Sequence, residues 1–567
     1  MTSIDPKGAP KAPSQTPAGP VSQPARAQPP TVPPAKPSPS HWRPSAKPIR
    51  PAELEALKAE NVSLVKLIGR DLEASLDNVL GYLRNPVLFN PDTAARDLKL
   101  MYALMLSAKP EQVDLTKLGQ PGHARNTLDK VFALQQALAE RIASFGAGYT
   151  REIADELRNI DRALHYLGDT ILLTIPNAAQ DGAAPALAKE IPHLHWTADA
   201  AHQSLDDLPD TFFVLVDGGS EVSDTIKTAT AVDAFVSHVA MVTREKDPTT
   251  GKTTYWMAEA TSSRGVYVHP LDPDQWFQKN VRSMIHVPTD ARLQKAFDTA
   301  GPKWLKEAYR RQQAGDPIPY NFAMDLADDS RTFCSQLPLQ VASLPEFKAV
   351  MGDQPVTFPR FASQLQTGDA VREVLHKWGI SAVETVAPGD FSIDPAFMLV
   401  ATARALPNSK LAHDINRGHM RSAVFSTMIN DWMQQRGYRL RTSNTYLVAA
   451  AVALGIRRTP FLGDLLLGKV MQPGMTSTVI ASVLDIDSVT TLIYHELEAA
   501  NEAFHQKNLR YMTFEEMKGA LEKIRLDDLA RYRAWLNEYR YDSTSQDAQE
   551  NYPRFSLALE PPQSLVQ

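Results

Sequence analysis

Cysteine is almost absent from this chain. Cys334 is the single cysteine in 567 residues. One cysteine cannot form an internal disulfide, and no pair of cysteines or cluster of cysteine and histidine could hold structural zinc. The composition therefore excludes a disulfide framework, and it directs attention to the segment SRTFCSQLPLQ, residues 330–340, which carries the thiol.

An excess of positive charge and long hydrophobic runs are missing as well. The net charge of −6 gives no electrostatic reason to expect a nucleic-acid partner. The N-terminus lacks the apolar stretch of a secretory signal. The longest apolar run, Tyr446 to Ile456, is too short to span a bilayer and is interpreted as a buried helix. We therefore expect synthesis in the cytoplasm, without a Sec signal or a transmembrane segment.

What is abundant is proline near the N-terminus. Residues 1–50 contain 14 of the 42 prolines and seven Lys or Arg residues against one acid, Asp5. Such a segment cannot bury enough apolar surface to offset the entropy of ordering. It is predicted to be a disordered basic arm, either a plain linker or an export and docking segment.

The rest of the chain is too long for one compact core, and its pattern of apolar and polar residues changes along its length. Helical periodicity predicts a helical domain at 51–180, and β-rich runs mixed with helices predict an α+β domain at 200–375. Helical patterns return at 376–545, where Thr513 and Glu516 form a capping box that starts a helix. The tail at 546–567 is polar and predicted to be loose.

The segment at 205–261 carries the clearest strand signals. TFFVLVD (211–217), SHVAMVTRE (237–245) and TTYWMAEAT (253–261) are rich in β-branched and aromatic residues, and REKDPTTGK between the last two is a good turn sequence. If the hairpin is centred between Pro248 and Thr249, His238 stands directly opposite Glu259, with Cβ atoms about 5 Å apart. At that distance a carboxylate can hold an imidazole in one tautomer.

Cys334 is placed where a thiol can be activated. A cysteine nucleophile needs a depressed pKa and an oriented base. The free N–H groups at the start of a helix help to lower that pKa. Pro338 is harmful inside a helix but harmless in its first turn, so it indicates a helix that begins close to Cys334.

Each of these residues also has a simpler interpretation. A lone cysteine is more often a small core residue, and a strand histidine among apolar neighbours is usually structural. Glu259 could be a solvated strand residue. The catalytic hypothesis rests on the three residues together.

Three stretches of the chain resemble the YiiX/YebB-like permuted papain-like cysteine hydrolases of the NlpC superfamily. They are DTIKTATAVDAFVSHVAMV, AEATSSRGVYVHPLD and YNFAMDLADDSRTFCSQL, between Leu208 and Ala342. They occur in the permuted order, with histidine before cysteine, and cover about a quarter of the chain. The resemblance implies a papain-like domain, a small antiparallel sheet plus helices, flanked by two helical domains.

The resemblance also implies roles for the three residues. Cys334 would be the nucleophile, His238 the general base and then the acid, and Glu259 the residue that orients the imidazole. The backbone N–H of Cys334 would be one oxyanion donor, and the second donor is not assigned. The family's Cys-Ser-Glu-Leu is Cys-Ser-Gln-Leu here because Gln336 replaces the glutamate, and Pro338 is also a departure.

The implied activity is that of a cysteine hydrolase or acyltransferase that forms a thioester with an amide, peptide or lipid ester substrate. A disordered arm with flanking helical domains also resembles a secreted bacterial effector, which would be exported by a specialised secretion system. The apolar C-terminal helices are explained equally well by peripheral contact with a membrane and by burial in a core. The alternative function is a non-catalytic interaction protein that keeps the papain-like scaffold. The oligomeric state is left open.

Two motifs that mimic cofactor sites are set aside, and we predict neither a cofactor nor a metal. GDLLLGKV (463–470) has the spacing of a P-loop, but Val470 stands where a magnesium-binding hydroxyl is required. HELEAANEAFH (495–505) begins like a zinc-protease helix, but position 499 is alanine instead of the second histidine. A solvated helix face is the preferred interpretation of that segment.

Overall fold

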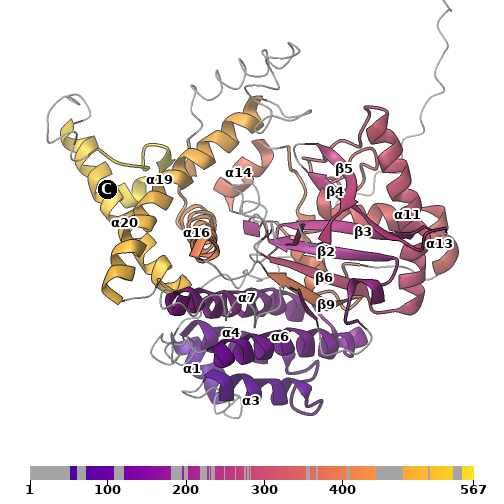
Figure 1. Cartoon of the computed structure of the whole chain (residues 1–567). Helices are drawn as coiled ribbons and strands as arrows, with labels where there is room; N and C mark the ends of the chain where they lie inside the picture. The colour runs from indigo at the N-terminus through magenta and orange to yellow at the C-terminus, as the bar shows by residue number, and fades with distance from the viewer. Residues whose placement is uncertain are drawn as a thin grey trace, which may run out of the picture. The chain divides into compact units, whose positions relative to one another are not determined.

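The computed structural model describes much of the chain from residue 51 onward (Figure 1). The described residues are 51–60, 72–107, 121–179, 194–196, 202–217, 227–228, 230, 236–247, 249–261, 264–273, 276–277, 280, 282–352, 358–365, 368–377, 379–404, 409–441, 477–508, 511–539, 549 and 552–566. The predicted arm, the apolar run 446–456 and the P-loop-like segment 463–470 lie outside them.

The fold is α+β, as predicted, and its centre is a seven-stranded antiparallel sheet. The strand order is β1-β9-β6-β2-β3-β4-β5, and Figure 1 shows β9, β6, β2 and β3 side by side. The bounds are β1 Leu194–Trp196, β2 Thr211–Asp217, β3 His238–Lys246, β4 Thr253–Thr261, β5 Gly265–Leu271, β6 Arg282–Pro288 and β9 Phe397–Arg404. The three strands predicted from the sequence, β2, β3 and β4, are confirmed.

The sheet does not end near residue 375, as the predicted domain boundary requires. Strand β9 pairs with both β6 and β1, and both it and β1 lie outside 200–375. The sequence FMLVATAR is a short apolar run without alternation, because β9 has neighbours on both edges and is covered on both faces. Periodicity cannot distinguish such a run from a buried helix.

One face of the sheet packs on helices that lie between β6 and β9 in the chain. Helix α11 (Ala291–Gln313) starts at Asp290, whose carboxylate accepts hydrogen bonds from the backbone of Arg292 and Leu293. The 3₁₀ helix η4 (Cys334–Gln336) leads into α12 (Leu337–Ser343), and α13 (Pro345–Met351) follows. Their apolar side chains form one core with β2, β3 and β4.

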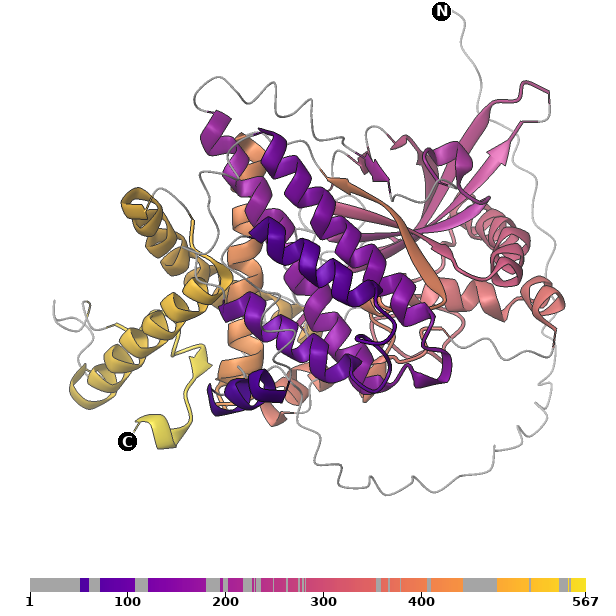
Figure 2. The same ribbon diagram turned by 90° about the horizontal axis from the view of Figure 1, so that it is seen from below.

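The described residues between 72 and 179 form a bundle of helices. It contains α3 (Leu72–Arg84), α4 (Ala94–Ser107), α6 (Pro121–Ala143) and α7 (Arg151–Ala179), preceded in the chain by α1 (Pro51–Glu60). Helix α3 packs on α6, and α7 packs on both α4 and α6. Figure 2 shows these indigo and purple helices side by side. Their shared core also includes Ile393, from the segment before β9.

A buried ionic cluster joins α7 to that same segment. Arg158 on α7 donates from Nη2 to Asp390 Oδ1 at 2.7 Å and to the carbonyl of Phe361 at 2.9 Å. Asp390 lies in the short helix α15 (Pro388–Ser392) and also accepts hydrogen bonds from the backbone N–H and hydroxyl of Ser363. The Arg158 and Asp390 side chains are 3% and 0% exposed, so water does not screen this pair.

The C-terminal part is helical apart from short strand pairs. Its elements are α14 (Asp369–Lys377), α16 (Ser409–Ser426), the π-helix η5 (Thr427–Met433), α19 (Ser477–Asn508), α20 (Phe514–Ala534), the π-helix η6 (Trp535–Tyr539) and α22 (Gln563–Val566). The short pairs are β7 (Ser363–Gln364) with β8 (Glu384–Thr385) and β10 (Arg439–Leu440) with β11 (Leu559–Glu560).

The predicted capping box is confirmed at the start of α20, where Thr513 and Glu516 exchange side-chain to backbone hydrogen bonds. Across the residues described, none of the helices has the length and apolar character needed to cross a membrane.

Candidate active site

The β3–β4 hairpin carries two of the three predicted site residues, with a register that differs from the prediction by two. Glu259 pairs with Ala240, so His238 lies two residues before the position opposite Glu259. The turn is centred later because Asp247 accepts backbone hydrogen bonds from Thr249 and Thr250. A shift of two residues keeps both side chains on the same face, so His238 still reaches Glu259 diagonally.

His238 links the thiol to the carboxylate. Its Nε2 lies 3.1 Å from Glu259 Oε2. The Cys334 thiol lies close enough to the imidazole to raise its pKa, and Sγ is also 3.9 Å from the backbone carbonyl oxygen of the neighbouring Ser237. The structure thus brings together the three residues selected from the sequence, in the order thiol, imidazole, carboxylate.

Cys334 begins a helix, as Pro338 predicted. It is the first residue of η4, and Pro338 lies in the first turn of α12. The next residue, Ser335, fixes this turn because its hydroxyl donates to the carbonyl of Val386 at 2.6 Å. The backbone N–H of Cys334 has no intrahelical acceptor at this position, which is what an oxyanion donor requires.

The electrostatics favour a thiolate–imidazolium pair. Burial alone would raise the pKa of the Cys334 thiol, but the nearby, positively charged imidazole of His238 lowers it, together with the backbone N–H groups of Val239 and Ser335. Burial also opposes the charge on His238, yet the proximity of Cys334 and the hydrogen bond to Glu259 raise its pKa. For Glu259, contact with two histidines overcomes burial and lowers the pKa to about 2.

The second of those histidines, His269 on β5, was missed by the sequence reasoning. Its Nε2 lies 3.2 Å from Glu259 Oε1, the oxygen that His238 does not use. The stretch GVYVHPL gives no sign of this role by itself. A strand assignment for 265–271, paired with β4, would have placed the side chain on the face of Glu259.

Gln336, which had no assigned role, holds the loop that precedes the thiol. Its Oε1 accepts from Asn321 Nδ2 at 3.2 Å, and its Nε2 reaches the carbonyls of Asp325 and Asp328. A glutamate, the residue of the family pattern, could not donate to those carbonyls when ionised. Gln336 is therefore a structural residue of this chain's own loop.

Tyr320 is a further residue of the site. It forms a bridge with Thr332, two positions before the thiol. Burial and the negative charge of a Cys334 thiolate raise the pKa of its phenol well above 10.

Gly265 lets the start of β5 pass close to the segment that leads to Tyr320. Its φ is +70°, and an added Cβ would lie 2.2 Å from the carbonyl oxygen of Ile318. The neighbouring Val266 N–H donates to that same oxygen at 2.8 Å. Only glycine combines this conformation with this approach.

Gly265→Ala is therefore expected to separate β5 from residues 318–320 and to destabilise the protein by about 2 kcal/mol or more, from the positive φ and the clash together. Chemical denaturation measures the effect. Gly251→Ala is the matched control, since Gly251 also has a positive φ of +68° but open space around it. Equal losses for the two variants would contradict a role for the close approach.

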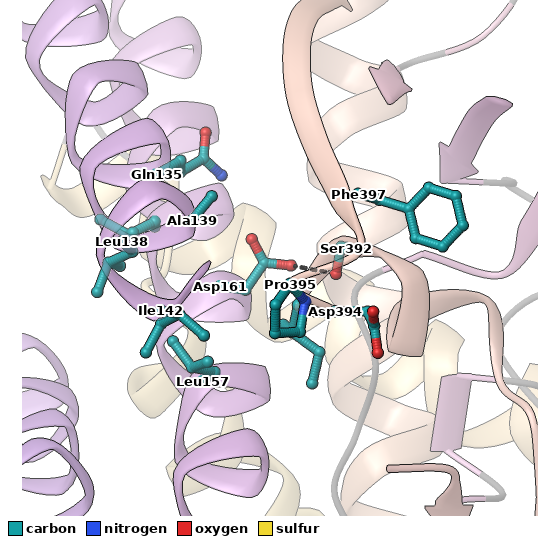
Figure 3. Close-up of a pocket in the computed structure, with 12 residues that line it drawn as sticks. Gln135, Leu138, Ala139, Ile142, Leu157, Asp161, Ser392, Asp394, Pro395 and Phe397 are labelled. Carbon is teal, nitrogen blue, oxygen red and sulfur yellow. Dashed lines mark hydrogen bonds between the residues drawn. The ribbon is translucent and has the colours of Figure 1, made fainter. Parts of the chain in front are cut away.

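A small cavity elsewhere is not continuous with these residues. It lies between α6, α7 and residues 392–397, with a volume of about 40 Å³, which holds a few water molecules (Figure 3). Its polar side chains are already paired, since Asp161 accepts from Ser392 at 3.1 Å and contacts His165 at 3.2 Å. We interpret it as a gap in the packing between the bundle and the segment that leads into β9.

The site is partly exposed on the side of the imidazole. The Cys334 residue is 3% exposed, whereas the side chains of His238, Glu259 and His269 are each about one-fifth exposed. In the described part of the chain, no group of three or more histidine, cysteine or acidic side chains is arranged to hold a metal ion. His495 of the zinc-protease-like segment is 65% exposed and pairs with Glu498, which fits a solvated helix face.

Comparison with known proteins gives no match, whether to a family model, a curated protein or a solved structure.

Proposed function

We propose that this protein is a cysteine hydrolase or acyltransferase with a permuted papain-like catalytic domain. The observation that carries the proposal is the position of His238, whose imidazole contacts Glu259 at 3.1 Å while the Cys334 thiol lies against the backbone of Ser237, the residue before it. A nucleophile, a base and a residue that orients the base are the parts that covalent acyl transfer needs. Their order along the chain agrees with the resemblance to the YiiX/YebB-like hydrolases.

The chemistry follows from this arrangement. The Cys334 thiolate attacks the carbonyl carbon of an amide or ester, and the negative charge moves to the carbonyl oxygen, where the Cys334 N–H can donate. Protonated His238 then gives its proton to the leaving nitrogen or oxygen as that bond breaks, which leaves a thioester. Neutral His238 next takes a proton from water or another acceptor, which attacks the thioester and restores the thiolate.

The substrate class is an amide, peptide or lipid ester. For a lipid ester, the apolar C-terminal helices would supply peripheral contact with a membrane. An export route through a specialised secretion system, as in bacterial effectors, belongs to the same proposal and rests on the arrangement of the arm and helical regions.

Alkylation by iodoacetamide between pH 4 and 9, read by intact mass, tests the proposal. The single cysteine makes the modified site unambiguous. We expect the native protein to be alkylated readily near pH 6, because an activated thiol is already ionised there. A thiol that reacts only after denaturation would contradict the proposal and favour the non-catalytic interaction protein.

A further inference from the structure

Glu259 is held by two histidines, one on each carboxylate oxygen. His238 on β3 contacts Oε2 at 3.1 Å, and His269 on β5 contacts Oε1 at 3.2 Å. The three side chains lie on one face of three adjacent strands, since Glu259 pairs with Tyr267 and His269 is the next residue on that face. The carboxylate therefore cannot rotate away from His238 without breaking the contact with His269.

Both ring nitrogens of His269 face hydrogen-bond acceptors. Nε2 faces the Glu259 carboxylate, and Nδ1 lies 2.9 Å from the carbonyl oxygen of Pro270. Neither a carboxylate nor a carbonyl can donate, so both contacts are hydrogen bonds only when the imidazole carries two protons. This geometry favours the doubly protonated, positively charged form of His269.

We propose that His269 is a positioning residue, which holds the Glu259 carboxylate toward His238 and balances its negative charge. The proposal rests on the proposed function, because it assigns a role within the same site. Cys334 and His238 form one pair of opposite charges, and Glu259 and His269 form a second. Without His269, the full charge of Glu259 would act on His238 alone.

The surroundings of His269 are consistent with this role. The rings of Tyr267 and His269 stack with their centroids 5.1 Å apart. The guanidinium of Arg264 lies over the Tyr267 ring, 4.6 Å from its centroid. Glu259 on β4 and Arg264, in the turn before β5, are the charged groups that act on His269, and α11 contributes Gln312, bonded to the backbone of Val268. The contact with Glu259 raises the pKa of His269, and Arg264 opposes this.

This raised pKa fixes the sign of the pH dependence. The stabilisation that His269 gains from Glu259 is fully present below its ordinary pKa of about 6.5 and is lost as the pH rises through its pKa in the folded protein. Removal of the His269 charge, by substitution or by deprotonation, leaves less positive charge near the Cys334 thiolate. The pKa values of Cys334 and His238 should then both increase.

Two substitutions distinguish the two effects of His269, which are to hold the Glu259 carboxylate in position and to balance its negative charge. His269→Gln keeps an N–H donor for Glu259 but removes the charge, whereas His269→Ala removes both. His495→Gln is the matched control, because His495 also contacts a glutamate, at 3.3 Å, but is largely exposed and lies on α19.

The measurement is the rate of Cys334 alkylation by iodoacetamide against pH, with the melting temperature of each variant. We expect the pH of half-maximal rate to rise by about one unit in both His269 variants, the effect of one charge removed, and to stay unchanged in His495→Gln. Hydrolysis of a reporter ester at each variant's optimum should fall about tenfold in His269→Ala and be largely restored in His269→Gln.

A wild-type profile with an activated thiol, together with unchanged profiles and ester rates in both His269 variants, would overturn this inference and leave the proposed function intact. Equal ester rates in the glutamine and alanine variants would overturn the positioning role. A wild-type thiol without activation would instead overturn the proposed function itself.

Discussion

His238→Ala is expected to move the pH of half-maximal Cys334 alkylation from below about 7.5 to above about 8.5. Histidine-paired thiols titrate at about 3.5–7.5, and a free thiol titrates near 8.5. The variant loses the interactions of His238 that lower the pKa of Cys334, so the backbone N–H groups of Val239 and Ser335 alone are left to oppose the effect of burial. Turnover of any acyl substrate should fall by about 10²–10⁴, the usual contribution of general acid–base catalysis.

The same variant should show the opposite effect at high pH. A more basic thiolate is a stronger nucleophile, so the limiting alkylation rate of His238→Ala should exceed that of the wild type once both are ionised. His376→Ala, at an exposed position on α14, is the control and should leave the profile unchanged. A limiting rate and a midpoint that both match the wild type would show that His238 does not ionise the thiol.

Arg158→Ala is expected to lower the free energy of unfolding by about 3–5 kcal/mol. The substitution leaves Asp390 buried without its main countercharge, and an unpaired buried charge costs this much. Arg158 also donates to the carbonyl of Phe361, so a second buried group loses its partner. Chemical denaturation followed by tryptophan fluorescence measures the change.

Arg125→Ala is the matched control for that experiment. Arg125 forms an ion pair with Asp129 on α6, with a distance of 3.9 Å and side chains 49% and 42% exposed. Exposed pairs contribute at most about 1 kcal/mol, so the two arginines should differ severalfold. Similar losses in both variants would show that burial of the Arg158–Asp390 pair is unimportant for stability.

The sequence predicts best where one local rule decides the outcome. The strands at 211–217 and 253–261, the helix start near Cys334 and the capping box of Thr513 all follow from short-range patterns. The predicted contact between His238 and Glu259 is present although the predicted register was wrong by two residues. Only a shift by an odd number of residues would place the two side chains on opposite faces of the sheet.

The features that were missed depend on distant parts of the chain. Arg158 and Asp390 are 232 residues apart, and nothing near either residue indicates the other. His269 contributes through the pairing of β5 with β4, which was not assigned. Strand β9 was interpreted as part of a helical region because a strand covered on both faces has no alternating pattern.

The hydroxyl of Ser335 has a practical consequence for dividing this protein into smaller pieces. Ser335 follows the nucleophile and is tied to Val386, and Asp390, four residues later, is tied to Arg158 on α7. A fragment cut at residues 200 and 375 would lose both anchors and would leave β6 as an apolar edge strand prone to aggregation. The shortest fragment that keeps the Ser335–Val386 and Asp390–Arg158 contacts and the pairing of β6 with β9 therefore runs from the start of α7 to the end of β9, residues 151–404.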